Sequence, residues 1–247
     1  MVEGLAGWGR GTEQSFAGDH NGSLGTIRRV HVPSLRDVAI ESIRDAIVSG
    51  HFASGQALRE RTLAEQLGIS TTPIKEALRI LVQQGLVITV PRKGNFVSTQ
   101  VDSLLSEVSM IRARLEGAAA RLAALKATDE DLELLQGQLA VMKKLTRDDV
   151  PDARALFEAN TAFHETVRAI ARNSMITQFL QTVSDLDRAF RKRALEMNGE
   201  VLLGFKEHSG IYEAIAAKDP DVAELEMRRH IMETAGRVLN KVDMPIR

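Results

Sequence analysis

Three histidines in the second half of the sequence carry the side chain that most often binds metal ions in proteins. His164, His208 and His230 each fall in a stretch with helical periodicity. Asn160 precedes His164 by one helical turn, so both side chains project from one helix face. Three imidazoles and one oxygen ligand suit Zn²⁺, with Ni²⁺ or another borderline divalent ion as alternatives. Such a site requires three helices to converge, and histidines that merely fill a core remain the alternative.

The stretch from Leu58 to Leu86 has the pattern of two short amphipathic helices joined by a turn at Gly68. Glycine can adopt the positive φ that ends the first helix, and Pro73 fits the first turn of the second. The apolar positions of the two helices are Leu63, Ala64, Leu67, Ile74, Ala77, Leu78 and Leu81. The pattern predicts a helix-turn-helix, whose second helix can lie in a DNA major groove. An ordinary packed helical hairpin is the alternative.

Flanking segments extend this pair of helices into a winged helix. An amphipathic helix is predicted from Leu35 to Val48, before the pair. After the pair, residues 86–90 and 95–98 are β-prone and surround a basic turn that contains Arg92 and Lys93. Two strands with a basic turn beside a helix-turn-helix predict a small β-wing.

Seven positions of the predicted winged helix are best placed to contact DNA: Arg61, Thr71, Thr72, Lys75, Arg79, Lys93 and Gly94. Lys75 and Arg79 are four residues apart and therefore share one face of the second helix. Lys93 and Gly94 are expected to approach the DNA backbone or minor groove. For Arg92, simple exposure to solvent is an equally good interpretation.

This region resembles the GntR family of bacterial transcription regulators. The matching residues are Ile47, Gly50, Phe52, Gly55, Leu58, Glu60, Leu63, Ala64, Leu67, Gly68, Ile69, Ser70, Thr72, Pro73, Ile74, Glu76, Ala77, Leu78, Gly85, Leu86 and Gly94. The resemblance implies a homodimeric regulator, usually a repressor, that binds a two-fold symmetric operator in double-stranded DNA. Family members usually carry arginine where this sequence has Thr71 and Lys75. Arginine can hold guanine O6 and N7 with two bonds, whereas lysine offers a point charge and threonine one hydroxyl, so we expect an operator with fewer guanine contacts than the common family half-site.

From about residue 101 the periodicity is helical throughout. Leu104, Val108, Ile111, Leu115, Ala118, Leu122 and Leu125 form one long apolar stripe on the first predicted helix. Five further helices are predicted to begin near residues 128, 152, 174, 201 and 220. The sequence therefore predicts a mostly α protein, with an N-terminal winged helix-turn-helix and a C-terminal all-α helical bundle.

The histidines lie in a pattern similar to the FCD domain, the helical effector domain of the FadR branch of the GntR family, in its six-helix VanR-like type. The matching residues are Asn160, Phe163, His164, Asn173, Glu207, His208, Ile211, Ala214, Ile215, Arg229 and His230. The resemblance implies a metal bound by Asn160, His164, His208 and His230. Asn160 stands where aspartate is common, and a neutral amide is a weaker ligand than a carboxylate.

Arg112, in the sequence Arg112-x-x-Leu115-Glu116, matches a family motif whose arginine holds the effector's carboxylate. The resemblance thus implies a small organic acid as the effector, held by an arginine beside a metal. Alternatively, Arg112 forms an exposed pair with Glu116 one turn later, or Arg114 takes the role of Arg112.

Bulk properties agree with a DNA-binding regulator without identifying one. The chain has 247 residues, a net charge of −1 and no cysteine, which excludes disulfides and thiolate metal sites. No apolar run approaches the roughly 18 residues of a membrane span, so we expect a cytoplasmic protein without membrane contact. The expected organisation is a disordered tail over 1–30, a winged helix over 31–99 and an effector-binding and dimerisation domain over 100–247. The chain is not expected to be an enzyme; the alternatives are a metal-dependent hydrolase fused to a winged helix, and a DNA-binding protein without an effector.

Overall fold

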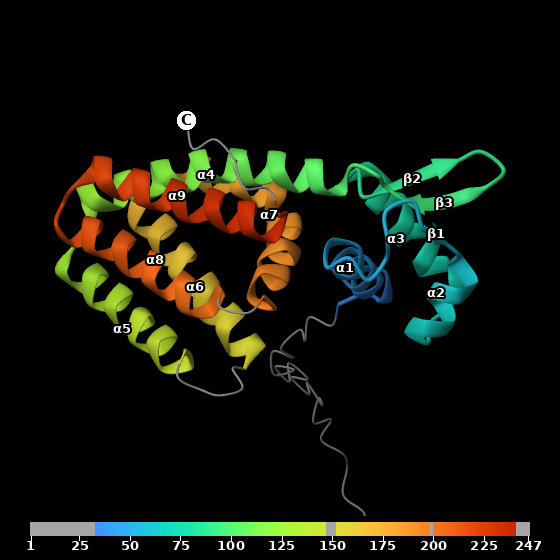
Figure 1. The fold of residues 1–247 in the computed structure, drawn as a ribbon, viewed down its shortest axis with the longest axis horizontal. Coiled ribbons are helices and arrows are strands. Elements are labelled where there is room, and N and C mark those ends of the chain that lie inside the picture. Colours follow the sequence, from blue (N-terminus) through green and yellow to red (C-terminus); the bar gives the residue numbers. More distant parts are fainter. Residues whose placement is uncertain (1–32, 147–151, 198–199, 241–247) are drawn as a thin grey trace, which may run out of the picture. The chain divides into compact units, whose positions relative to one another are not determined.

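The computed structural model describes residues 33–146, 152–197 and 200–240. The predicted tail over 1–30 lies outside the described residues. The elements, labelled in Figure 1, are α1 (Leu35–Val48), β1 (Ala57–Leu58), α2 (Glu60–Leu67), α3 (Thr71–Gln83), β2 (Val87–Val90), β3 (Gly94–Val97), α4 (Val101–Lys126), α5 (Asp129–Leu145), α6 (Ala153–Ala171), α7 (Ser174–Leu195), α8 (Glu200–Ala216) and α9 (Pro220–Val238). The mostly α fold predicted from the sequence is confirmed.

Helices α2 and α3 form the predicted helix-turn-helix. Gly68 ends α2 in the left-handed conformation with a φ of 66°, so the chain turns without the steric cost that a side chain adds. Ser70 occupies the N-cap position of α3, and Pro73 lies in its first turn. The apolar face of α3 is almost fully buried and consists of Ile74, Ala77, Leu78 and Leu81. This core leaves the opposite face of α3 open to solvent.

The wing is a three-stranded antiparallel sheet in the order β1-β3-β2. Val90 pairs with Gly94 at the tip, and residues 91–93 form the turn between them. The two longer strands follow the sequence-based prediction. The third strand, β1, was not predicted, because a segment of two residues is too short to show the alternation that identifies a strand.

The predicted apolar stripe of α4 coincides only in part with its buried face, to which Val108 belongs at 8% exposed. Ile111 is 53% exposed and Leu125 is 60% exposed. The buried face also contains small and charged residues, among them Arg112 and Glu116. Gly117 lies against α9, where a Cβ atom would stand only 2.6 Å from Arg228 Cγ. The small residues of α4 therefore allow α9 to pack closely along it (Figure 1).

Short polar side chains fix the starts of the helices that carry the histidines and their neighbours. Thr128 and Asp131 form a capping box at α5. The N-cap side chains of α6, α7 and α9 are Asp152, Asn173 and Asp219. A core around Phe163 joins α6, α8 and α9. Among the described residues, none of the helices has the length and apolarity needed to cross a bilayer.

Candidate metal centre and DNA-binding surface

The helices α6, α8 and α9 bring the three histidine rings together in the protein interior. His164 and His208 are each 1% exposed, and His230 is 6% exposed. Their potential ligand atoms all lie within 4.8 Å of one another. The distance from His164 Nε2 to His208 Nε2 is 3.3 Å. Two nitrogens bound to one tetrahedral zinc ion, each about 2.05 Å from it, are also about 3.3 Å apart.

The outer nitrogens of two rings are held by hydrogen-bond acceptors. His208 Nδ1 lies 2.6 Å from the carbonyl oxygen of Gly204, and His230 Nδ1 lies 2.6 Å from Glu207 Oε2. An Nδ1–H that donates to these oxygens leaves the Nε2 lone pair of each ring available to a metal. His164 Nδ1 lies 3.6 Å from Glu116 Oε2, and both atoms lack a hydrogen-bond partner. A small rotation of the ring would place a carboxylate behind this histidine as well.

Burial keeps the three rings in their neutral form. It lowers the pKa of His164 and His208 well below the usual value, and the nearby positive charge of Arg112 adds to the effect. Burial, followed by the charge of Arg112, lowers the pKa of His230 to about 3. Neutral imidazole is the form that binds metals, so protons do not compete for these nitrogens near neutral pH.

Asn160 lines the same cavity of about 50 Å³ as His208, His230 and Arg112. Its side chain is half-buried, and Oδ1 accepts a long hydrogen bond of 3.4 Å from Arg191 Nη1. Asn160, His208 and His230 thus line one small cavity, and the ligand atoms of His164 lie within 4.8 Å of those of the other two histidines. This donor set fits a borderline divalent ion such as Zn²⁺ or Ni²⁺.

Arg112 lies near Glu116, as the alternative interpretation expected, but the pair is buried and not exposed. Arg112 Nε lies 3.6 Å from Glu116 Oε1, but the side chains are only 6% and 1% exposed. A closer partner is Asp187, whose Oδ1 lies 2.7 Å from Arg112 Nη1. Arg114, the competing candidate, is exposed on α4.

Sequence-based reasoning assigned no role in this region to Asp187 and Arg191, and it named Glu207 only as part of the family pattern. Asp187 and Arg191 are four residues apart on α7 and form an ion pair of 3.0 Å. Their spacing was visible in the sequence, but it is common on exposed helix faces. Only the packing of α7 against α4 shows that Asp187 is buried and that the Arg191 side chain is just 12% exposed.

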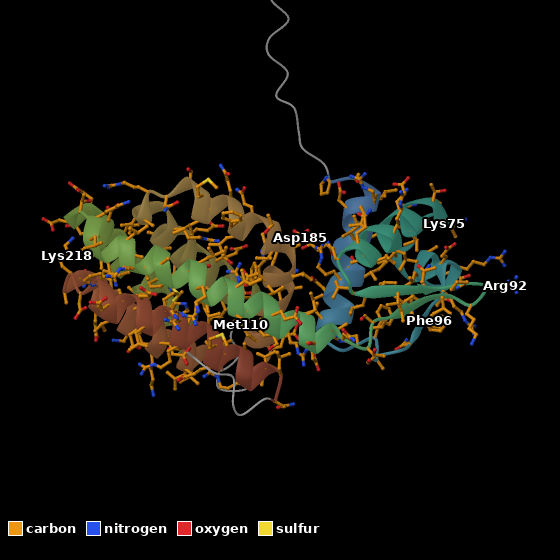
Figure 2. The ribbon with its side chains drawn as sticks, turned by 90° about the horizontal axis from the view of Figure 1, so that it is seen from above. Lys75, Arg92, Phe96, Met110, Asp185 and Lys218 are labelled. Atoms are coloured by element: carbon orange, nitrogen blue, oxygen red, sulfur yellow. The ribbon has the colours of Figure 1, made fainter. Side chains whose placement is uncertain are left out.

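The exposed face of α3 carries most of the predicted DNA contacts. Thr72, Lys75 and Arg79 are exposed, whereas Thr71 is half-buried. Arg61 is exposed on the neighbouring α2. Lys75 Nζ lies 3.8 Å from Glu60 Oε2, a partly exposed pair that costs little to separate. Figure 2 shows Lys75 on this domain, away from its core.

The wing presents further basic groups. Lys93 and Gly94 are exposed at the turn, and Gly94 has a φ of 99°. Arg92 lies at the end of the wing in Figure 2 and also adopts a left-handed conformation, with a φ of 64°. The wing turn therefore exposes two basic side chains, Arg92 and Lys93. The next residue, Gly94, has no side chain that would cover the backbone.

Comparison with known proteins assigns a family or domain to each of the two parts of the chain. Residues 35–97 match the model of the gntR family of bacterial regulatory proteins, and residues 107–233 match the FCD domain. The probable D-xylose utilization operon transcriptional repressor of Paenarthrobacter nicotinovorans is 30% identical over 205 residues, covering 79% of this chain and 87% of the relative. The uncharacterized HTH-type transcriptional regulator YdhC of Bacillus subtilis is 28% identical over 190 residues, 76% of this chain and 84% of its own length.

A solved structure shows the same fold. The Escherichia coli protein McbR/YncC superposes with a TM-score of 0.61 at 21% identity, over 86% of this chain and 100% of that one. The matched domains and relatives are transcriptional regulators and not enzymes, which gives the hydrolase alternative no support. The chain belongs to the GntR family of bacterial transcriptional regulators and carries the FCD domain.

Proposed function

We propose that this protein is a homodimeric repressor, acting in the cytoplasm, that binds a two-fold operator and senses a small organic acid through a metal in its helical domain. The proposed division is a winged helix over 31–99 and an effector-binding and dimerisation domain over 100–247. The proposed sensor function rests on one observation: His164, His208 and His230 converge from three helices. The observation that supports DNA binding is the exposed polar face of α3 above an apolar core.

DNA recognition is assigned to Arg61, Thr71, Thr72, Lys75, Arg79, Lys93 and Gly94. Lys75 and Arg79 lie on the helix face that enters a major groove in other helix-turn-helix proteins. Lys75 can contact a base edge or a phosphate as a point charge, and Thr71 and Thr72 each offer one hydroxyl. Lys93 and Gly94 meet the backbone or the minor groove beside the major groove.

Selection of bound duplexes from a random pool tests this assignment. We expect one two-fold symmetric sequence that differs from the usual family half-site at positions read by arginine in other members. The variant Lys75→Arg should increase the preference for guanine at one position per half-site. Recovery of the usual family half-site with the wild-type protein would show that Thr71 and Lys75 do not alter specificity.

The metal is assigned to His164, His208, His230 and Asn160. When bound, the ion supplies positive charge and open coordination positions for the oxygen atoms of an acid. Gly204 and Glu207 hold two of the rings in the required orientation. Zn²⁺ is the best match to the donor set, with Ni²⁺ as the next. Metal analysis of protein reloaded with each ion should give one ion per chain.

The effector carboxylate is assigned to Arg112, which lines the cavity next to His208 and His230. A guanidinium can hold a carboxylate with two parallel hydrogen bonds. The ion and Arg112 thus offer two kinds of contact to one small acid. A thermal-shift screen of sugar acids, dicarboxylates and amino acids, with and without Zn²⁺, tests this assignment.

The dimer is assigned to an apolar surface of α4 and α7. Its exposed members are Ile111 and Leu125 on α4 and Met175 and Phe179 on α7, each more than half exposed. Half-buried Leu115, Ala118 and Leu122 join them to the small core between the two helices. In an isologous contact the same surface of both subunits meets across a two-fold axis, and an exposed apolar surface such as this one suits that arrangement. Two winged helices related by that two-fold axis would match a two-fold operator.

A further inference from the structure

Arg112, the proposed effector arginine, belongs to a group of buried and half-buried charged side chains that extends beyond the metal site. We call the side chains of Arg112, Glu116, Arg168, Asp187 and Arg191 the arginine–carboxylate cluster. Asp187 lies at its centre: Oδ1 is 2.7 Å from Arg112 Nη1, and Oδ2 is 3.0 Å from Arg191 Nε. Glu116 lies 3.6 Å from Arg112 and 3.8 Å from Arg168. One aspartate therefore uses both of its oxygens to hold two arginines.

The charges of the cluster do not balance. Three guanidinium groups face two carboxylates, which leaves one positive charge in excess. The neighbouring Glu207 lies outside the cluster, where it contacts His230 at 2.6 Å and Arg237 at 3.0 Å, and Arg237 also lies 3.8 Å from Glu233. A divalent ion on the three neutral histidines would raise the excess to three charges. Uncompensated charge in a protein interior is unfavourable, so this region favours an anion with two or more negative charges.

The contacts of Asp187 are close but poorly directed. Arg112 Nε, Arg191 Nε and Asp187 Oδ1 are buried and have no hydrogen-bond partner of acceptable geometry. The attraction between Asp187 and the arginines is thus mainly Coulombic. A ligand carboxylate that meets both guanidinium groups in plane would gain hydrogen bonds that Asp187 does not make.

Two cavities adjoin the two arginines. Arg112 and Arg191 line the small cavity with His208 and His230, and they also line a second cavity of about 630 Å³. Asp187 and Arg168 line the second cavity. Its volume lies in the range of small-molecule sites. A ligand in the second cavity can therefore reach the arginines at the position that Asp187 occupies.

We propose that Asp187 is an internal carboxylate that occupies the effector arginines, and that a small acid with at least two negative charges displaces it. This proposal rests on the proposed sensor function and names its ligand class and its trigger. One carboxylate of the acid takes the place of Asp187 on Arg112 and Arg191. The remaining negative charge compensates the excess of the cluster and the ion.

The helix that carries Asp187 also contacts the first helix of the winged helix. Asp185, labelled in Figure 2, lies 2.8 Å from Arg44 on α1. Arg188 lies 3.2 Å from Glu41. The residues on either side of Asp187 thus hold α1 by ion pairs. Release of Asp187 from the arginines changes the restraint on α7 and, through these pairs, on the helix that supports the DNA-binding core.

The variant Asp187→Asn in the full-length, zinc-loaded protein tests the proposal. It keeps the shape of the side chain and removes the competing charge. The probes are acetate, succinate and citrate at constant ionic strength, with binding measured by calorimetry. We expect Asp187→Asn to bind succinate or citrate at least about tenfold more tightly than wild type, with a smaller gain for acetate. Unchanged or weaker binding, or no saturable binding of any probe by either protein, overturns the proposal.

The matched control is Glu165→Gln. Glu165 is an exposed carboxylate of the same second cavity, so this variant removes one negative charge without freeing an arginine. Its affinity for citrate should stay within about twofold of wild type. An equal gain in both variants would show a general electrostatic effect and overturn the exchange at Asp187. If Asp187→Asn does not fold, Asp187→Ser gives the same comparison with a smaller side chain.

Measurements of DNA binding distinguish a failure of this proposal from a failure of the proposed function. Without any acid, Asp187→Asn should shift the affinity for the selected duplex toward the value that wild type shows with saturating citrate. If wild type binds zinc and the duplex but Asp187→Asn changes neither acid nor DNA affinity, the regulator stands and the exchange is wrong. If wild type binds neither zinc nor any duplex, the proposed function itself fails.

Discussion

Basic side chains stand in opposite environments in the winged helix and in the helical domain. The Lys75 side chain is 61% exposed and has one loose partner, Glu60, at 3.8 Å. The Arg112 side chain is 6% exposed and has Asp187 at 2.7 Å and Glu116 at 3.6 Å. An exposed cation binds whatever anion arrives and is weakened by salt. A buried cation must be paired at all times, so its partner can only be exchanged and not simply lost.

This difference agrees with the distinct tasks that we propose for the two regions. The exposed surface of α3 and the wing suits DNA, a large polyanion whose affinity depends on many weak contacts. The buried cluster suits one small acid, which we propose replaces Asp187 on the arginines. The winged helix is therefore expected to be sensitive to salt, and the helical domain to the presence of metal and acid. The following predictions test this contrast, beginning with the largest expected effect.

Removal of one metal ligand should abolish metal binding. His208→Ala takes away one of the three converging imidazoles, and the remaining two cannot hold the ion with comparable affinity. We expect the bound zinc of the purified, reloaded protein to fall from one ion per chain to none, measured by elemental analysis. His51→Ala changes an exposed histidine of the winged helix and should leave the zinc content unchanged. Full zinc occupancy in His208→Ala would refute the site.

A charge in the apolar surface of α4 and α7 should produce monomers. Ile111→Glu and Phe179→Glu each place a carboxylate at the proposed centre of the dimer contact, where it cannot be hydrated. Light scattering after size exclusion should give the monomer mass. Leu134→Glu on α5 is a control with equal exposure, 54% against 53% for Ile111, and should stay dimeric. Dimers in both test variants would place the interface elsewhere.

Truncation of the exposed basic residues of α3 should weaken DNA binding without changing the fold. For Lys75→Ala and Arg79→Ala we expect roughly 10- to 100-fold lower affinity for the selected duplex, because each removes a base or phosphate contact. Fluorescence anisotropy at several salt concentrations would also show a shallower salt dependence. Arg154→Ala, an exposed arginine on α6, serves as the control. Equal affinity in all three variants would exclude α3 from the contact with DNA.

Acid should destabilise the metal-free protein through its buried histidines. The folded-state pKa of His230 is lowered to about 3, so the unfolded chain binds a proton first as the pH falls below about 6.5. The stability that the neutral ring contributes is present above that pH and is lost on acidification. Between pH 7 and pH 5 the loss amounts to about 2 kcal/mol for this ring. In EDTA, denaturant titrations should show that His230→Gln loses less stability than wild type over this range.

The two regions also differ in how far the sequence predicted them. The winged helix follows local rules: Gly68 ends a helix, Pro73 begins one, and the spacing of Ile74, Ala77 and Leu78 marks the buried face. Each rule involves residues close in the chain. For that reason the predicted positions of α1, α2, α3 and the two longer strands agree with the structure.

The helical domain depends on contacts between distant segments. The apolar stripe of α4 was only partly right: Val108 is buried, but Ile111 and Leu125 are exposed, because Gly117 and several alanines occupy much of the buried face. Periodicity cannot show that Arg112 is buried, since the compensating Asp187 comes from another helix. The histidines could be named because a family pattern includes them. Their convergence, and the partners of their outer nitrogens, required the structure.

The most direct test of the central claim is a measurement of DNA binding by the full-length protein. Zinc-loaded protein is titrated against a duplex recovered by selection, in the presence of excess random duplex at about 150 mM salt. We predict specific binding that Arg79→Ala weakens and that citrate alters. Equal binding to selected and random duplex, with and without zinc and citrate, would contradict the assignment of α3 and the wing to operator recognition.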